Sequence, residues 1–280
     1  MVRNELVRLG QGGWHLGDDP SREKIEIKSL QLGVKLGMTL IDTAEMYGDG
    51  RSETLIGRAI KPFPRSAYQL VSKVLPHNAG RKRIFASCNA SLSRLGTDYL
   101  DVYLLHWRGD VPLSETIECM EELVAQGKIL CWGVSNFDTP DMEELWSTQG
   151  GQNCAVNQVL YHLGSRGIEY DLLGWLHTHN VMAMAYCPLA QAGRLRRLRP
   201  DFWKNKTLAD IAAKYNASIA QLLLAFTLRD SNVIAIPKSS SPAHTRENAG
   251  AITLRISNED WRAIDQIYQP PTCKMHLDIE

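Results

Sequence analysis

Short, nearly continuous apolar runs alternate with longer amphipathic segments along the whole chain. The apolar runs are rich in Val, Ile and Leu, which is typical of parallel strands that are buried on both faces. We expect a first strand within Val7–Trp14, followed by strands at Thr39–Asp42, Tyr68–Lys73, Tyr99–His106, Leu130–Asn136, Cys154–Leu160, Val181–Tyr186 and Val233–Lys238. The amphipathic segments predict helices at Ser21–Leu36, Ser52–Lys61, Arg81–Leu95, Ser114–Gln126, Pro140–Thr148, Tyr170–Thr178, Leu208–Tyr215, Ile219–Arg229 and Ser257–Tyr268.

This alternation predicts a closed barrel of parallel strands. We expect a (β/α)8 TIM barrel that forms a single domain over residues 1–280. A doubly wound open sheet is the alternative. The glycine cluster Gly10–Gly13 does not predict a Rossmann turn, because the pattern G-x-G-x-x-G requires glycine where this chain has His15. Ser257–Tyr268 would be an additional helix, and Pro270 would begin a short tail.

Seven of the predicted strands carry, at or near their C-terminal end, a residue that can react or form hydrogen bonds. These residues are Asp42, Lys73, His106, Asn136, Gln158, Tyr186 and Lys238. In a (β/α)8 barrel the C-terminal ends of all strands meet at one face, and that face holds the active site. The pattern therefore predicts an enzyme whose side chains, far apart in sequence, surround one pocket.

Composition excludes several other classes of protein. Lys and Arg together number 31, as do Asp and Glu, so no strong overall field favours nucleic acid or an acidic membrane. The apolar runs are too short to span a membrane, and the first residues do not form a secretory signal. The six cysteines lack C-x-x-C spacing, which indicates buried thiols in a reducing cytoplasm and no metal site. We expect a cytoplasmic monomer.

Four of the polar residues form a catalytic constellation. Asp42 and Tyr47 are five residues apart, and Lys73 and His106 end the next two strands. A buried lysine near a phenol favours the phenolate, so we expect Lys73 to lower the pKa of Tyr47, with Asp42 holding the lysine charged. His106 could donate a hydrogen bond to a carbonyl substrate. Together they would supply a general acid for an oxyanion, although the lysine and aspartate could also be a merely structural ion pair.

Longer motifs point to a known family. The stretch IDTAEMYGDGRSETLIGRAI is followed in order by LLHW, GVSNF, NQVLYH, YCPLAQ and IPKSS. In these motifs the chain resembles the aldo-keto reductase superfamily over essentially its whole length. The resemblance implies a barrel that binds a nicotinamide dinucleotide without a Rossmann domain and reduces aldehydes or ketones with NADPH. It also implies that Asp42, Tyr47, Lys73 and His106 are the catalytic tetrad.

The same resemblance implies the residues that bind the cofactor. Ser135, Asn136 and Gln158 would bind the nicotinamide carboxamide, and Tyr186 would stack on the ring. Pro188, Leu189 and Gln191 would contact the pyrophosphate. Lys238 and Ser239 would bind the 2′-phosphate, and Glu247 and Asn248 would lie near the adenine. Members that prefer NADPH usually carry Arg where this chain has His244, and Arg246 follows two residues later. We therefore expect NADPH to bind more tightly than NADH, but by a smaller margin than in those members.

The substrate side is defined by aromatic residues. Trp14 and Trp107, with Tyr47 and His106, would line a pocket for small carbonyls. The resemblance to compact members of the family implies dicarbonyls such as methylglyoxal. Short loops around it predict an open pocket. The basic run 194–199 is either a solvated face or a loop that closes over the cofactor phosphates. A cofactor-sensing regulatory barrel with little turnover is the alternative function, and a glycosidase would need a second strand-end carboxylate.

Overall fold

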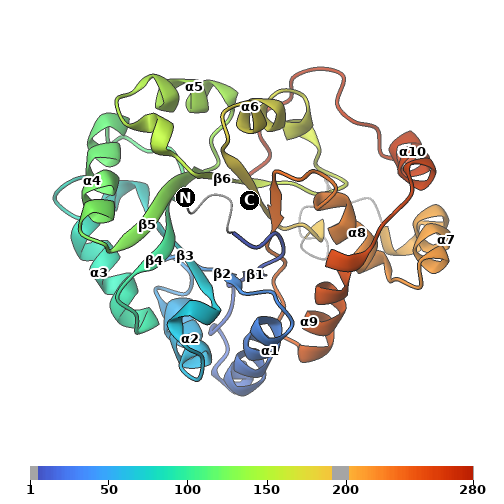
Figure 1. Cartoon of the computed structure of the whole chain (residues 1–280), viewed down its shortest axis with the longest axis horizontal. Coiled ribbons are helices and arrows are strands. Elements are labelled where there is room, and N and C mark those ends of the chain that lie inside the picture. The colour runs from blue at the N-terminus through green and yellow to red at the C-terminus, as the bar shows by residue number, and fades with distance from the viewer. Residues whose placement is uncertain (1–5, 191–201, 280) are drawn as a thin grey trace.

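The computed structural model describes residues 6–190 and 202–279, and within them one parallel sheet of eight strands forms the centre of the molecule. Its strands are β1 (Gln11–Gly12), β2 (Leu40–Asp42), β3 (Gln69–Val74), β4 (Leu100–Leu105), β5 (Ile129–Ser135), β6 (Val156–Leu160), β7 (Met182–Tyr186) and β8 (Val233–Ala235). They follow each other in sequence order, and parallel bridges from Leu9 to Ala235 and from Gly12 to Lys238 join the last strand to the first. The predicted (β/α)8 barrel is confirmed (Figure 1).

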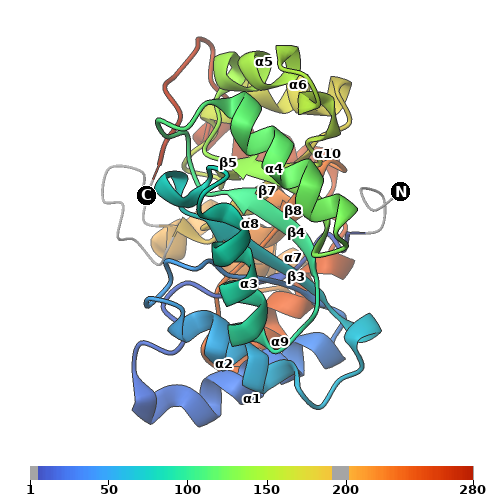
Figure 2. The ribbon, with the colours of Figure 1, turned by 90° about the vertical axis from the view of Figure 1, so that its left-hand side faces the viewer.

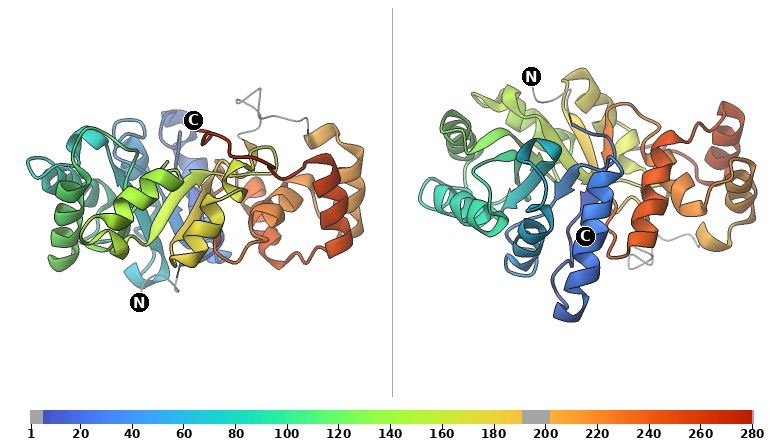
Figure 3. Two further views of the ribbon diagram at one scale, coloured as in Figure 1. Left: turned by 90° about the horizontal axis from the view of Figure 1, so that it is seen from above. Right: turned by 60° about the horizontal axis from the view of Figure 1, so that its bottom comes forward.

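Helices surround the barrel, as Figures 1 and 2 show. They are α1 (Glu23–Lys35), α2 (Arg51–Ile60), α3 (Ile84–Leu95), α4 (Leu113–Ala125), α5 (Thr139–Ser147), α6 (Leu172–Thr178), α7 (Lys206–Lys214), α8 (Ile219–Thr227), α9 (Pro242–Ala249) and α10 (Asn258–Ile267). Helix α9 packs against α1 and completes the ring beside β8. Helices α7 and α10 pack together on one flank, outside that ring (Figure 3).

Helix α9 is the one element of this ring that the hydrophobic pattern did not predict. Only Thr245 and Asn248 of its eight residues are buried, so its sequence lacks an apolar stripe. The sequence does indicate where this helix begins, because Pro242, a residue typical of the first helical position, follows Ser241. Helix α2 also begins differently from the prediction: it starts after Gly50, and the buried Ser52 hydroxyl donates to the Gly13 carbonyl.

Two apolar layers hold the barrel together. Leu40, Val71, Val102, Leu104, Val156, Met184 and Ile234 fill its interior. A larger cluster lies between the strands and the surrounding helices, where the apolar faces of the helices meet the outer side of the sheet. Buried on both sides, the strands are fixed in register, so each polar strand end has a defined place at the C-terminal mouth.

The C-terminal tail packs against the loops that follow β5 and β6. The Lys274 ammonium donates to Asp138 at 2.6 Å and to Asp171 at 2.8 Å, in the loops that follow β5 and β6. The Ser165 hydroxyl donates to Asp278 at 2.7 Å. Among the helices within residues 6–190 and 202–279, none combines the length and apolar character needed to cross a membrane.

Close packing of α2 on α3 requires glycine at position 57. A Cβ added there would lie 2.7 Å from the Arg94 carbonyl oxygen and 2.8 Å from that of Leu95, both backbone atoms. We predict that Gly57→Ala lowers the free energy of unfolding by about 1–3 kcal/mol, because the two helices must separate. Gly174→Ala is the control, since a Cβ on this exposed glycine of α6 meets nothing within 4 Å.

The control should be stabilised by about 0.5–1 kcal/mol through helix propensity alone. Urea unfolding of the two variants measures both effects. Equal changes in the free energy of unfolding for the two substitutions would show that the close contact between α2 and α3 does not require glycine at position 57.

Candidate active site

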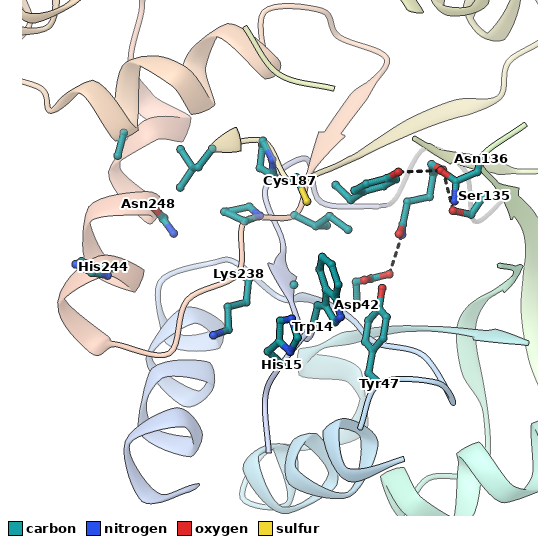
Figure 4. A pocket seen from close by; sticks show the side chains of 18 of the residues that line it. Trp14, His15, Asp42, Tyr47, Ser135, Asn136, Cys187, Lys238, His244 and Asn248 are labelled. Carbon is teal, nitrogen blue, oxygen red and sulfur yellow. Dashed lines mark hydrogen bonds between the residues drawn. The ribbon is translucent and has the colours of Figure 1, made fainter. Parts of the chain in front are cut away.

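A cavity of about 760 Å³ opens at the C-terminal mouth of the barrel. Its lining includes most of the predicted site residues: Trp14, Asp42, Tyr47, His106, Ser135, Asn136, Gln158, Tyr186, Pro188, Leu189, Lys238, His244, Glu247 and Asn248. Figure 4 shows Asp42 and Tyr47 near one end of this group and Lys238 and His244 toward the other. Six of the seven predicted strand-end residues line this cavity, and the seventh, Lys73, is buried and does not.

A buried ion pair forms the floor of the cavity at its catalytic end. The ammonium of the fully buried Lys73 donates to Asp42 at 2.8 Å, to the Thr43 carbonyl at 2.8 Å and to the Tyr47 hydroxyl at 3.0 Å. Three acceptors thus satisfy all three N–H groups of the ammonium. The Tyr47 hydroxyl, in contact with this ammonium, lies at the cavity wall.

The expectation that the pKa of Tyr47 lies below its ordinary value is wrong for this structure. Burial raises the pKa of the Tyr47 phenol well above its ordinary value, and the negative charge of Asp42 raises it further. Burial also raises the pKa of Asp42 and lowers that of Lys73, while the attraction between the two opposes both shifts. Tyr47 is therefore a protonated phenol at neutral pH, the state that a proton donor requires.

His106 stands beside Tyr47, with ring centroids 5.7 Å apart in an edge-to-face arrangement. Burial, and secondly the charge of Lys73, lower the pKa of His106 to about 2. The imidazole is therefore neutral and carries one N–H. Its Nδ1 is buried without a hydrogen-bond partner, and a bare lone pair there costs less than an unpaired N–H. We infer that the proton is on Nε2, where it can be donated to a group in the cavity.

Polar side chains at the ends of β5, β6 and β7 form a connected group next to the ion pair. The Tyr186 hydroxyl donates to Asn136 Oδ1 at 2.9 Å, and Asn136 Nδ2 donates to the His106 carbonyl at 3.3 Å. The Ser135 hydroxyl donates to the Gln158 carbonyl at 2.9 Å. Asn136 has φ of +60°, a left-handed conformation that asparagine tolerates better than most residues. This geometry fixes the side chains that were predicted to bind an amide.

The other end of the cavity carries positive charge and the start of α9. Lys238 follows β8, and His244 lies in the first turns of the helix, with Glu247 and Asn248 one turn later. The first backbone N–H groups of a helix and a nearby ammonium both favour an anion. This end of the cavity is suited to a phosphate group.

Several predicted residues do not line the cavity. The Ser239 hydroxyl is turned to the Ser241 carbonyl at 2.9 Å, and Arg246 is exposed on α9. Trp107 is 37% exposed and contacts the His106 ring at 4.9 Å between centroids, but it is absent from the lining. Gln191 and the basic run 194–199 lie outside the described residues.

Residues that were not predicted also line the cavity, and those with large or reactive side chains are His15, Met46, Cys187 and Trp203. Three of them directly adjoin a predicted residue in sequence: His15 follows Trp14, Met46 precedes Tyr47, and Cys187 follows Tyr186. Extending each strand end by one residue would have found His15 and Cys187. Trp203 lies far from any strand end in sequence, so no local signal indicates it. In the described part of the chain, no cluster of His, Cys, Asp and Glu could hold a metal ion.

Comparison with known proteins gives one consistent result. The model of the "Aldo/keto reductase family" matches residues 8–269. The chain is 50% identical to methylglyoxal reductase YeaE of Escherichia coli (strain K12), over 98% of this chain and 95% of that protein. It is similar in structure to an aldo/keto reductase from Klebsiella pneumoniae in complex with NADP and acetate, with a TM-score of 0.95, 49% identity and coverage of 98% of this chain and 96% of that one.

A second Klebsiella pneumoniae structure, of an aldo-keto reductase in complex with NADPH, also has a TM-score of 0.95 and 49% identity over 98% of this chain and 95% of that one. Together with the barrel and the buried ion pair at the cavity floor, these matches establish that the chain is an oxidoreductase and belongs to the aldo/keto reductase family.

Proposed function

We propose that the protein reduces small aldehydes and dicarbonyls such as methylglyoxal to alcohols, with NADPH as cofactor and Tyr47 as the general acid. The observation that carries this proposal is the hydrogen-bonded series from Asp42 through Lys73 to Tyr47 at the cavity wall. The likeness to a methylglyoxal reductase at 50% identity supports the substrate class. The two Klebsiella relatives bound to NADP and NADPH support the cofactor.

The residues at hand fit such a cofactor. The described hydrogen bonds of the Gln158 side chain are all made by Nε2, which leaves Oε1 as an acceptor, and the Ser135 hydroxyl also retains an acceptor lone pair. We expect these groups and Asn136 to bind a carboxamide, and Tyr186 to stack on its ring. At the other end, Lys238 and His244 would hold the 2′-phosphate, with Pro188 and Leu189 between the two ends. When bound, NADPH supplies the hydride.

The chain's own residues then handle the proton. His106 donates its Nε2–H to the carbonyl oxygen, and Tyr47 transfers its phenolic proton to the same oxygen as negative charge develops there. The ammonium of Lys73 stabilises the phenolate that remains. Because the ammonium is already 3.0 Å from the Tyr47 oxygen, this stabilisation needs no rearrangement of the side chains.

Every residue that the proposed reaction uses belongs to one chain, so the reaction requires no second copy, and we propose that the enzyme works as a monomer. None of the six cysteines forms a disulfide, and that is usual for proteins of the reducing cytoplasm, where we propose that this enzyme acts.

Replacement of Tyr47 by phenylalanine tests the proposed acid. We predict that Tyr47→Phe lowers kcat for methylglyoxal by at least about a hundredfold, the usual contribution of a general acid, while the Kd for NADPH changes little. Tyr170→Phe, a change at a half-exposed tyrosine away from the cavity, should behave as wild type. A folded Tyr47→Phe enzyme with near-normal turnover would contradict the assignment.

The cofactor preference depends on His244. Histidine cannot bind a phosphate through two parallel N–H groups as arginine does, and the nearby Arg246 is exposed and outside the cavity lining. We predict that wild type prefers NADPH only modestly, and that His244→Arg lowers the Kd for NADPH about fivefold, or about 1 kcal/mol, without changing the Kd for NADH.

Titration of both cofactors against tryptophan fluorescence measures these constants. The matched control is His177→Arg, which adds the same side chain at an exposed position of α6. Equal affinity of wild type for the two cofactors, or an equal gain for both in His244→Arg, would show that the phosphate lies elsewhere.

A further inference from the structure

Gln158 contacts both the ion pair and the amide-binding group. Its Nε2 donates to Asp42 Oδ1 at 2.8 Å and lies 3.0 Å from the sulfur of Met184. The other carboxylate oxygen of Asp42 accepts from Lys73. Each oxygen of this buried carboxylate therefore has one donor, and they come from different strands, β3 and β6. In Figure 4 a dashed line joins Asp42 to the side chain that lies above it.

The direction of this hydrogen bond follows from the chemistry. A carboxylate only accepts, so the end of the Gln158 amide that faces Asp42 must be the NH₂ group. The oxygen end then remains available as an acceptor. The backbone carbonyl of Gln158 is also used, since it accepts from the Ser135 hydroxyl at 2.9 Å and from the Asn136 N–H at 2.8 Å.

We propose that Gln158 is a positioning residue, which keeps Asp42 ionised for Lys73 and Tyr47 through its amide N–H and links this series to the amide-binding side of the cavity. The link to the cofactor rests on the proposed function, whereas the hydrogen bond from Gln158 to Asp42 is independent of it. Without the amide, Asp42 Oδ1 would lose the one side-chain donor that the described structure gives it. A buried carboxylate with a vacant oxygen is a weaker partner for a buried ammonium.

Other charged and titratable groups also act on this series. Lys73 acts directly on Asp42, Glu53 acts on Lys73, and Asp42 and Cys187 act on Tyr47. His106 is kept neutral, in part by Lys73. A change at position 158 replaces none of these side chains, so an effect of that change can be attributed to the loss of the amide.

Loss of the Gln158 donor can change the pKa of Asp42 in one direction only. Burial raises the pKa of Asp42, and the hydrogen bonds from Lys73 and Gln158 oppose that rise. Loss of the Gln158 donor must raise the pKa further. Protonated Asp42 does not need the donor, so the extra instability of a variant is absent at low pH and develops as pH rises through the titration of Asp42.

The first experiment uses the cofactor-free protein. Urea midpoints of wild type, Gln158→Met and Ser135→Ala are measured from about pH 4 to about pH 7. Methionine fills a similar volume but cannot donate, and the Ser135 change removes a bond to the Gln158 carbonyl without touching the Asp42 carboxylate. The gap between wild type and Gln158→Met should widen as pH rises, whereas the gap for Ser135→Ala should stay constant. Parallel pH curves for the two variants would overturn the proposal.

The second experiment measures kcat against pH at saturating cofactor. The acid limb for Gln158→Met should move up by about one pH unit, the scale of a hydrogen bond to a charged group. Ser135→Ala should weaken cofactor binding and leave this limb in place, and an unmoved limb in Gln158→Met would also refute the proposal.

Should Gln158→Met not fold, Gln158→Asn, whose side chain is one methylene shorter, is used in the same two comparisons. If NADPH does not bind at all, the proposed function fails, and the unfolding experiment still decides the role of Gln158.

Discussion

A buried ammonium is stable only when acceptors surround it, and the position of Lys73 imposes this constraint on the whole active site. Its side chain is fully buried, and an isolated charge there would cost several kcal/mol. Asp42, the Thr43 carbonyl and the Tyr47 hydroxyl meet this need. Strands β2 and β3 must pair in one register for these contacts to form, and the pairing of Asp42 with Val71 provides it. Apolar packing that holds β2 and β3 in this register therefore also holds Asp42, Lys73 and Tyr47 in contact at the mouth of the barrel.

The protonation states at this mouth follow from burial more than from pairwise attraction. Burial keeps the Tyr47 phenol protonated and the His106 imidazole neutral, although a lysine ammonium lies nearby. Both side chains can therefore donate to a carbonyl oxygen at neutral pH. The Lys73 ammonium donates to the phenol oxygen, and it stabilises the negative charge that appears on Tyr47 when the proton leaves. Such stabilisation acts on the transition state rather than on the resting enzyme.

The sequence predicted the barrel because the alternation of apolar and amphipathic segments can be read directly along the chain. It predicted the ring of strand ends because the C-terminal ends of all strands in such a barrel meet at one face. It could not predict the pKa of Tyr47, since the lysine is visible in the sequence but the depth of burial is not. Helix α9 was missed because its one contact face is polar. Arg246 and Ser239 were expected at the phosphate end, yet the turn into α9 directs Arg246 to solvent and Ser239 to Ser241. The place of Trp203 in the cavity depends entirely on the tertiary fold.

The measurement that bears most directly on this account is the kcat of Lys73→Met with saturating NADPH and methylglyoxal. The variant removes the ammonium and retains a long apolar side chain, and Lys82→Met at an exposed position is its control. The account predicts that kcat falls by at least about a hundredfold in a variant that still folds and binds NADPH, while the control is unaffected. A folded Lys73→Met enzyme that keeps half of the wild-type kcat would contradict it.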